Sequence, residues 1–499
     1  MPAQPKTKIE PDSDAVELRG LLDQLTALRE DVIAGGANLA EQWGAGKCTE
    51  SAAVRALNLG HYVALRGHDL TGLQYRLAAH GLSSLGRSEA KVLPALDALI
   101  VTLRRSLGET ASHYPSLRLM RAGQADLEAE ALRLFGPPHA GAPRARILAT
   151  LPPEAADDAE LVARLIETGM DCARINCAHD DPPAWARMIA NIRAAEARFD
   201  VSCRVLMDIA GPKCRIAEVS APPKYRVQRS QRLTITEVLD AQSAIPEFTL
   251  TFPQIVDQLA IGAEVFIDDG KAMARVVGKT AGRAEIEVYA AREKGVRLKT
   301  DKGINFPTTE IELPPLTPKD FRDLDFVAEH ADLVGFSFVQ RAEDVELLQA
   351  ELAARRSKPL AQAIVLKIET PLAVRNLPRL IVQSIALNPT GVMIARGDLA
   401  VEIGFARLSE MQEEILWLCE AAHTPVIWAT QVLDQFVRDG VASRSEMTDA
   451  AAGQGAECVM LNKGPHLVEG VAFLRDVLTR MDRHYAKKFP RYTRLRAWS

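Results

Sequence analysis

Charged side chains stand where short apolar stretches of this sequence end. The stretch that begins at Ile364 ends in Lys367 and Glu369, and the next such stretch is followed by Gly397 and Asp398. Residues two apart in a strand share a face, so Lys367 and Glu369 point the same way. A lysine and a carboxylate inside an apolar run are costly unless they are paired or bind a metal. The pattern therefore predicts a site built at the ends of neighbouring strands.

Glu369 and Asp398 predict a site for a divalent metal ion. Mg²⁺ favours one or two protein carboxylates, with substrate oxygens and water completing its octahedron, so Mg²⁺ or Mn²⁺ is the expected cofactor. Lys367, Arg174 and Arg215 would add fixed positive charge around the ion. This combination suits phosphoryl transfer, in which catalysis is mostly positioning and neutralisation of the moving group. The alternative is a buried ion-pair network that only holds the protein together.

Further polar residues follow other apolar stretches but carry weaker signals. His179 could contact a nucleotide, although a loop histidine beside two aspartates is as often simply solvated. Gly397 could present backbone amides to a substrate carboxylate, or it could form an ordinary turn. Thr430 could handle a proton or bind substrate. Each of these residues is a candidate because it follows a predicted strand.

Eight short apolar stretches predict the architecture that positions these residues. They are Ile147–Leu151, Cys172–Cys177, Val205–Ile209, Leu333–Phe338, Ile364–Ile368, Gly391–Ala395, Val426–Ala429 and Cys458–Leu461. Most are separated by a helical pattern, at intervals of about 27 to 34 residues, with one exception. Even alternation of eight strands with helices predicts an α/β fold with a closed (β/α)8 TIM barrel; an open doubly wound sheet is the rival.

The exceptional interval, between the third and fourth strands, predicts an inserted domain. Its middle shows alternating strands and an Asp-Gly hairpin signal at Asp269-Gly270. Together these patterns divide the chain into an N-terminal helical domain (1–135), a linker (136–143), a barrel catalytic domain (144–217 and 303–482), an inserted small β-barrel lid domain (218–302) and a basic tail (483–499). Within the helical domain, Gly35-Gly36 is expected to end the first helix.

Composition excludes several classes of protein. Sixty basic and 65 acidic residues give a net charge of −5, which argues against a nucleic-acid-binding surface. No apolar run is long enough to span a bilayer, and the first residues lack the apolar core of a secretory signal. The seven cysteines are scattered and form no Cys-x-x-Cys pattern. We therefore expect a cytoplasmic protein with reduced thiols and no membrane or nucleic-acid partner.

The ordered motifs from about Arg144 to Met481 resemble the pyruvate kinase family. The segments that carry the resemblance are Ala173–His179, Met207–Arg215, Lys302–Pro307, Leu366–Glu369, Ile394–Leu399, Trp428–Gln431 and Ser443–Glu446. The resemblance implies a kinase that moves the phosphoryl group of phosphoenolpyruvate to ADP, giving pyruvate and ATP.

The resemblance also implies roles for individual residues. Glu369 and Asp398 would hold the metal, and Lys367, Arg174 and Arg215 would bind the phosphoryl group. The amides of Gly397 and Asp398 would receive the substrate carboxylate, with Thr430 near the face where the enolate is protonated. The nucleotide would lie towards Asn176, His179 and Lys302, beneath the inserted domain.

The departures from the family pattern concern the monovalent cation. Of the four side chains that usually bind potassium in the family, Asn176 and Asp208 are present here. Ala178 and Ile209 stand where the other two, a serine and a threonine, would be. Lys213 stands where potassium-dependent members carry glutamate. Its ammonium could replace the ion while pairing with Asp208, so activity without potassium is expected.

By this resemblance, no counterpart of the family's C-terminal α/β domain is expected here, and the helical region is expected to be an addition to the family pattern. That region could provide oligomer contacts, and a homo-oligomer is expected. Two other functions stay open. Altered loops after the first, third and eighth strands allow the same metal–carboxylate core to act on another enolate or 2-oxo acid. A non-catalytic ligand-binding or scaffold protein is the third possibility, although a scaffold needs none of Lys367, Glu369, Asp398 and Thr430.

Overall fold

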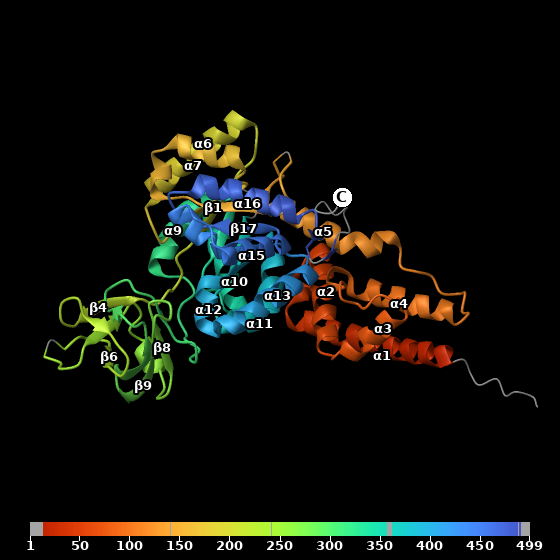
Figure 1. The fold of residues 1–499 in the computed structure, drawn as a ribbon, viewed down its shortest axis with the longest axis horizontal. Coiled ribbons are helices and arrows are strands. Elements are labelled where there is room, and N and C mark those ends of the chain that lie inside the picture. Colours follow the sequence, from red (N-terminus) through yellow and green to blue (C-terminus); the bar gives the residue numbers. More distant parts are fainter. Residues whose placement is uncertain (1–12, 140, 241, 357–361, 488, 491–499) are drawn as a thin grey trace, which may run out of the picture.

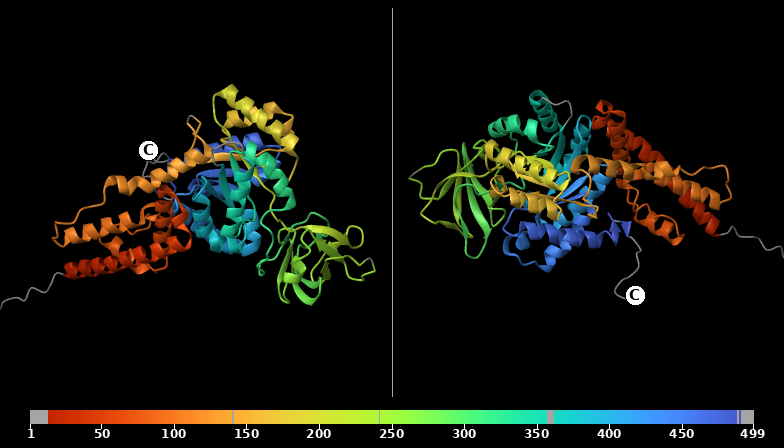
Figure 2. Two further views of the ribbon diagram at one scale, coloured as in Figure 1. Left: turned by 180° about the vertical axis from the view of Figure 1, so that it is seen from behind. Right: turned by 90° about the horizontal axis from the view of Figure 1, so that it is seen from above.

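The computed structural model describes residues 13–490 apart from 140, 241, 357–361 and 488. A parallel barrel lies in the middle of the molecule, with a region of N-terminal helices on one side and a separate β domain on the other (Figure 1). The views from behind and from above show the same arrangement (Figure 2). Among the described residues, no helix combines the length and the apolar character needed to cross a membrane.

The barrel confirms the predicted closed (β/α)8 fold and excludes the open sheet. Its strands are β1 (Arg146–Thr150), β2 (Cys172–Asn176), β3 (Arg204–Asp208), β13 (Leu333–Phe336), β14 (Ala363–Ile368), β15 (Thr390–Ala395), β16 (Val426–Val432) and β17 (Cys458–Leu461). All neighbouring pairs are parallel, and β1 closes the barrel on β17. Since all eight carboxyl ends meet at one rim, polar residues that follow different strands are brought together there.

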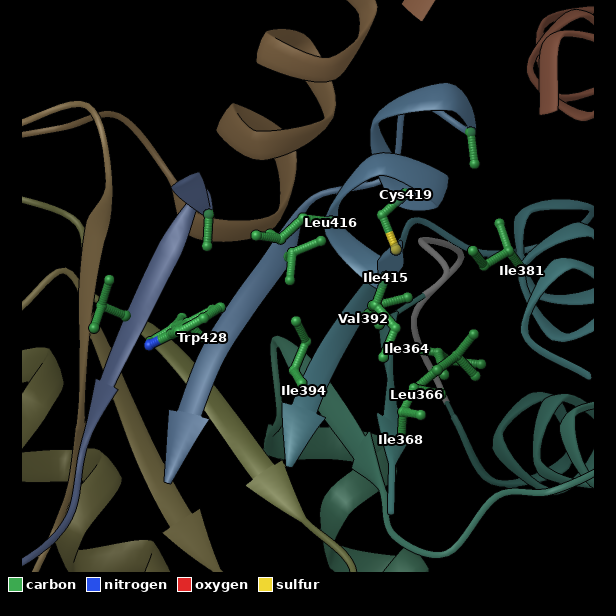
Figure 3. Packing of buried hydrophobic residues seen from close by; sticks show 14 of the residues in the cluster. Ile364, Leu366, Ile368, Ile381, Val392, Ile394, Ile415, Leu416, Cys419 and Trp428 are labelled. Carbon is green, nitrogen blue, oxygen red and sulfur yellow. The ribbon is translucent and has the colours of Figure 1, made fainter. Parts of the chain in front are cut away.

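Helices cover the outside of the barrel. They include α6 (Ala159–Thr168), α7 (Pro182–Phe199), α9 (Pro318–His330), α10 (Ala342–Arg355), α11 (Pro371–Ile385), α12 (Arg396–Ile403), α13 (Phe405–Ala421), α14 (Asp434–Asp439), α15 (Arg444–Ala452) and α16 (Leu467–Met481). On β14, Ile364, Leu366 and Ile368 alternate outward into the same apolar cluster as Ile381 of α11 and Ile415 of α13 (Figure 3). The intervening residues must therefore face the barrel interior.

The β domain emerges after β3 and has its own apolar core. It contains β4 (Ile216–Ser220), β5 (Arg226–Val227), β6 (Arg232–Thr236), β7 (Glu247–Leu250), α8 (Ile255–Gln258), β8 (Glu264–Ile267), β9 (Ala272–Thr280), β10 (Arg283–Ala291), β11 (Val296–Arg297) and β12 (Ile304–Asn305). The predicted hairpin joins β8 to β9, and its turn residues Asp268, Asp269 and Gly270 all have positive φ. Because the domain is inserted at the carboxyl end of a strand, it adjoins the polar rim.

The N-terminal region is helical, as predicted, but its first helix does not end at Gly35-Gly36. It contains α1 (Ser13–Gln42), η1 (Ala45–Lys47), α2 (Glu50–Arg66), α3 (Thr71–Ala79), η2 (Glu89–Lys91), α4 (Val92–Ser106) and α5 (Leu117–Phe135). A β-carbon on Gly36 would lie 2.5 Å from the His61 ring, and one on Gly60 would lie 2.3 Å from the Gly36 carbonyl oxygen. The glycines serve a close crossing of α1 and α2, and this packing overrides their tendency to end a helix.

The C-terminal end of α5 closes the amino end of the barrel. Leu134 and Phe135 are almost fully buried and share one apolar cluster with inward-facing residues of all eight strands. An irregular segment then leads from Gly136, whose φ is 78°, into β1. At the other end of the chain, β18 (Tyr485–Ala486) pairs with β19 (Phe489–Pro490). Most of the predicted basic tail, including Lys488, Arg491, Arg494 and Arg496, lies outside the described residues.

Candidate active site

Lys367 lies at the centre of a buried ionic cluster at the carboxyl end of the barrel. Its Nζ lies 3.3 Å from Asp208 Oδ2 and 3.2 Å from Glu369 Oε1, and it donates a 2.7 Å hydrogen bond to Ser337 Oγ. Burial alone would lower the pKa of Lys367, but the negative charges of Asp208 and Glu369 outweigh burial and raise it. The amine is therefore a fixed positive charge, and Lys367 and Glu369 point the same way, as their spacing predicted.

Asp208 joins Lys367 to Arg174. Arg174 Nε donates to Asp208 Oδ2 at 2.7 Å, and its Nη1 donates to Thr150 Oγ1 at 3.1 Å. Asp208 is fully buried, which would raise its pKa, yet the charges of Arg174 and Lys367 lower it. Its Oδ1 accepts no hydrogen bond from the described residues. The guanidinium of Arg174 is thus held in place and turned towards the rim.

Lys213 does not pair with Asp208, and the predicted pairing is wrong. Its Nζ lies 2.6 Å from Asp398 Oδ1, on the next part of the rim. Asp208 is already paired with two buried cations, Arg174 and Lys367, so a third positive charge is better placed on a carboxylate that lacks one. The ammonium therefore stands beside a predicted metal ligand, while Asn176 uses its side-chain oxygen to accept the Ala178 N–H at 3.0 Å.

Glu369 and Asp398 are close enough to influence each other. Burial is the main reason that the pKa of Glu369 is raised, and the charge of Asp398 raises it further. Glu369 also accepts the Phe338 N–H at 2.6 Å, which fixes its orientation. A cation shared by the buried Glu369 and the half-buried Asp398 relieves the repulsion between their carboxylates. The described residues contain no group of three or more His, Cys, Asp or Glu suited to a metal, so this pair fits Mg²⁺ only if substrate oxygens and water complete the coordination.

The first turn of α12, which directly follows β15, is fixed by Thr430 and Arg396. Gly397 N–H donates to Thr430 Oγ1 at 2.7 Å, and Thr430 itself has a φ of 62°. Arg396 donates to the Ala429 carbonyl oxygen at 2.9 Å, pairs with Asp449 and stacks over the Trp428 ring. A non-glycine residue in the left-handed region persists only when its surroundings hold it, so these contacts define where Gly397 and Asp398 stand.

Arg215 and Lys302 lie at the base of the β domain, outside the ionic cluster. Arg215 donates to the Asp301 carbonyl oxygen at 2.9 Å and forms an isolated bridge with Gly303. Lys302 pairs with Asp268 at 2.8 Å. Both side chains are therefore tied to the β domain rather than to the carboxylates of the barrel.

A cavity of about 300 Å³ opens beside Arg174 at the rim. Its lining includes Asn176 and His179, two of the three residues expected towards the nucleotide, but not Lys302, and it includes Lys463, for which the sequence predicted no role. Burial is the main cause of the lowered pKa of His179, and the charge of Lys463 lowers it further. Ser337, the partner of Lys367, was also missed; it stands inside the predicted stretch Leu333–Phe338, whereas β13 ends one residue before it, at Phe336.

A second cavity, of about 240 Å³, separates the β domain from the barrel and reaches Lys213 and Phe338. In its wall Asn305, from β12, donates to Glu402 Oε1 at 2.6 Å. Glu402 belongs to α12, the helix that carries Asp398, and burial raises its pKa to about 7. This contact joins the return from the β domain to the helix of a predicted metal ligand, and no motif in the sequence had pointed to it.

Comparison with known proteins decides the family. The family model described as "Pyruvate kinase, barrel domain" matches residues 142–465. This chain belongs to the pyruvate kinase family. The pyruvate kinase of Agrobacterium vitis is 32% identical over 348 residues, which cover 68% of this chain and 69% of that protein. That of Geobacillus stearothermophilus is also 32% identical, over 68% of this chain and 57% of its own length. The pyruvate kinase of Thermococcus litoralis is 30% identical over 71% of this chain and 73% of its own length.

The pyruvate kinase match places the site within the shared part of the chain. Every candidate site residue lies between 142 and 465, and so does the whole β domain. The helices α1 to α5 precede the matched residues. The aligned segments span between 57% and 73% of the lengths of the three pyruvate kinases named above.

Proposed function

We propose that this protein transfers the phosphoryl group of phosphoenolpyruvate to ADP, giving pyruvate and ATP. The observation that supports the proposal is the buried cluster in which Lys367 stands within 3.3 Å of both Asp208 and Glu369, with Arg174 beside it. A fixed ammonium and a fixed guanidinium at one rim suit a group that carries negative charge throughout its transfer. A purely structural role would not need four ionised side chains at the polar end of a barrel.

In this reaction the bond between phosphorus and the enol oxygen breaks as a bond to the terminal phosphate oxygen of ADP forms. Lys367 neutralises the moving group and Arg174 binds its oxygens, and Arg215 would join them from its place at the base of the β domain. The enolate left behind takes a proton at carbon to become pyruvate. Thr430, held beside Gly397, stands near that face and passes the proton through water. The amide of Asp398 would bind the substrate carboxylate, joined by that of Gly397 once its hydrogen bond to Thr430 Oγ1 opens.

Glu369 and Asp398 would hold Mg²⁺ or Mn²⁺. Held by these two carboxylates, such an ion would supply Lewis acidity for the charge that develops on the substrate. Asn176, His179 and Lys302 would face the nucleotide, with residues 218–302 acting as a lid over it. The catalytic unit would then be the barrel, residues 144–217 and 303–482, in a cytoplasmic homo-oligomer.

The test is direct formation of both products. The purified chain is incubated with phosphoenolpyruvate, ADP and Mg²⁺, and pyruvate and ATP are measured separately and are expected in equal amounts. If neither forms, the altered loops give weight to a second function, in which the same carboxylate pair acts on another enolate or 2-oxo acid. The replacements Ala210 and Asn462-Lys463-Gly464 in those loops favour that alternative. A chain that binds these compounds without converting any of them would be a ligand-binding or scaffold protein.

We also propose that activity needs no potassium ion. The ammonium of Lys213, 2.6 Å from Asp398, already supplies a monovalent positive charge at the rim. Lys213→Glu would remove that charge and place a carboxylate there, so this variant is expected to need potassium for activity. Rates are compared with and without potassium chloride, with tetramethylammonium chloride keeping the ionic strength equal. A wild-type rate that rises steeply with potassium would contradict the proposal.

A further inference from the structure

A large cavity lies at the opposite end of the barrel from the candidate active site. Its volume is about 570 Å³. Its lining comes from α5, from η2 and nearby Arg87, from the segment between α5 and β1, and from Arg146, Glu420, Glu457, Ala486 and Lys487. The cavity therefore lies where the N-terminal helices meet the floor of the barrel. A concave space of this size is within the range that holds small organic molecules.

The lining divides into an apolar part and a basic part. The apolar part comprises Met120, Leu127, Ala131, Pro138 and Pro143. The charged side chains are basic at Arg87, Lys91, Arg144, Arg146 and Lys487, and acidic at Glu128, Glu420 and Glu457. Five basic against three acidic groups leave a positive excess in this partly open space.

The buried acid of this cavity is already neutralised. Glu457 is 4% exposed, lies 2.6 Å from Lys487 Nζ and 3.3 Å from Arg144 Nη1, and also accepts the Val426 N–H. Burial would raise the pKa of Glu457, but these two cations lower it. The carboxylate of Glu457 thus neutralises Lys487 and pairs with one nitrogen of Arg144. It does not neutralise the other basic groups of the lining.

Two basic groups lack a carboxylate partner among the hydrogen bonds and ion pairs of the described residues. Arg146 is 8% exposed and donates only to the carbonyl oxygens of Gly136 and Arg144. Lys91 makes no ion pair with any residue that the structure describes. In addition, Arg144 Nε is buried and finds no hydrogen-bond acceptor among the described residues. Guanidinium groups with donors to spare suit planar or tetrahedral oxyanions.

We propose that this cavity binds an amphipathic organic anion, a small molecule with one carboxylate or phosphate head and an apolar body. The head would lie against the basic side chains and the body against Met120, Leu127 and Ala131. A molecule in this position would contact the helical region, the barrel floor and the C-terminal segment at once. Because it binds only where these three parts are assembled, its binding raises the stability of the folded chain.

The experiment titrates the full chain with hexanoate and with phenyl phosphate by calorimetry, and follows melting temperature in parallel. Acetate and inorganic phosphate serve as probes without an apolar body, and hexanol and phenol as probes without a charge. At least one of the two amphipathic anions is expected to bind at one site per chain and raise the melting temperature, about tenfold more tightly than its comparators. The stronger of the two identifies the head group.

Variants locate the site. Lys91→Glu reverses the unpaired charge and is expected to weaken binding at least about tenfold. Gln124→Trp adds bulk from an exposed position in the lining and is expected to block the body without disturbing the core. Arg118→Glu is the control, since it makes the same reversal on an exposed position of α5 outside the cavity. Equal binding by wild type and both cavity variants, or no binding of either anion by wild type, would overturn the proposal.

Discussion

The two ends of the barrel are built from the same strands but from opposite kinds of residue. Along β14, Ala363 and Val365 face inward near the amino end and join the cluster of Phe135 from α5. Two and four residues further on, Lys367 and Glu369 face inward at the carboxyl end and join Asp208. One strand therefore changes from apolar to ionic within its own length. Stability and chemistry are therefore assigned to separate ends of one scaffold.

The energetic consequences of the two ends have opposite signs. Burying an aromatic or aliphatic side chain such as Phe135 contributes roughly 1.5–3 kcal/mol. Removing a charged group from water costs several kcal/mol, and ion pairing offsets that cost only when the geometry is good. The amino end thus stabilises a fold whose carboxyl end keeps charges ready for a substrate.

The largest expected effect is the loss of catalysis in Lys367→Met. Methionine is of similar length but cannot neutralise a transferring phosphoryl group, so the rate of pyruvate formation is expected to fall at least about 10³-fold. The rate is measured in a coupled assay at room temperature, with circular dichroism to verify folding.

Lys47→Met, on the distant helix η1, is the matched control and should retain the wild-type rate. A folded Lys367→Met variant with a rate within tenfold of wild type would show that the ionic cluster at the carboxyl end is structural, like the apolar cluster at the amino end.

At the amino end, Phe135→Ala is expected to lower the free energy of unfolding by about 3–5 kcal/mol through lost burial and the cavity left behind. The rate per folded molecule at room temperature should not change. Leu132→Ala, on the same helix but 48% exposed, should change the stability by less than about 0.5 kcal/mol. Thermal melts and kinetics on the same samples separate the two effects, and a fall in rate without a fall in melting temperature would break the comparison.

The crossing of α1 and α2 extends the comparison beyond the barrel. Gly60→Ala places a β-carbon 2.3 Å from the Gly36 carbonyl oxygen and is expected to cost about 1–3 kcal/mol of stability. Gly72→Ala in α3 meets no atom within 4 Å and should be neutral or stabilising by up to about 1 kcal/mol. Chemical unfolding measures both, and equal effects of the two changes would contradict the close-crossing interpretation.

The smallest expected effect is that of replacing Glu402. This substitution raises the free energy of unfolding, whereas Phe135→Ala lowers it. The pKa of Glu402 is raised to about 7, so the folded chain binds more protons than the unfolded chain between its ordinary pKa and pH 7. Stability must therefore fall as pH rises through this window. Glu402→Gln removes the ionisation and is expected to stabilise the chain by about 1–2 kcal/mol at about pH 8, with a smaller gain near pH 5.

The measurement is the difference in melting temperature between Glu402→Gln and wild type at both pH values. Glu293→Gln, at an exposed position of the β domain, removes the same charge as a control and should give no such trend. A gain that is larger at the lower pH than at the higher one would reverse the assigned cause.

The strands and the ionic cluster could be predicted because their signals are local. Each of the eight barrel strands overlaps a short apolar stretch, and Lys367 and Glu369 follow from a period of two within one strand. The course of α1 could not be predicted in this way. Nothing near Gly36 in the sequence shows that Gly60 will cross it, so the glycines indicate a helix end until the partner helix is placed.

Partners between distant elements were the other limit. The sequence indicates that Lys213 follows β3 and that Asp208 is close to it in the chain, yet Lys213 pairs with Asp398, 185 residues away. The carboxylate with which a lysine pairs depends on which carboxylates are already neutralised. Asp208 is already neutralised by Arg174 and Lys367. The contact of Asn305 with Glu402 was missed for the same reason, since it joins two elements 97 residues apart.

The plug formed by Leu134 and Phe135 has a consequence for biosynthesis. These residues leave the ribosome first, but the opening that they fill is complete only when Cys458 and Met460 of β17 have followed. About 320 residues separate the two events, which corresponds to roughly 15–65 s of translation at ordinary elongation speeds. During that interval the apolar end of α5 lacks the barrel strands against which it packs. A nascent chain that exposes such a surface is expected to bind chaperones.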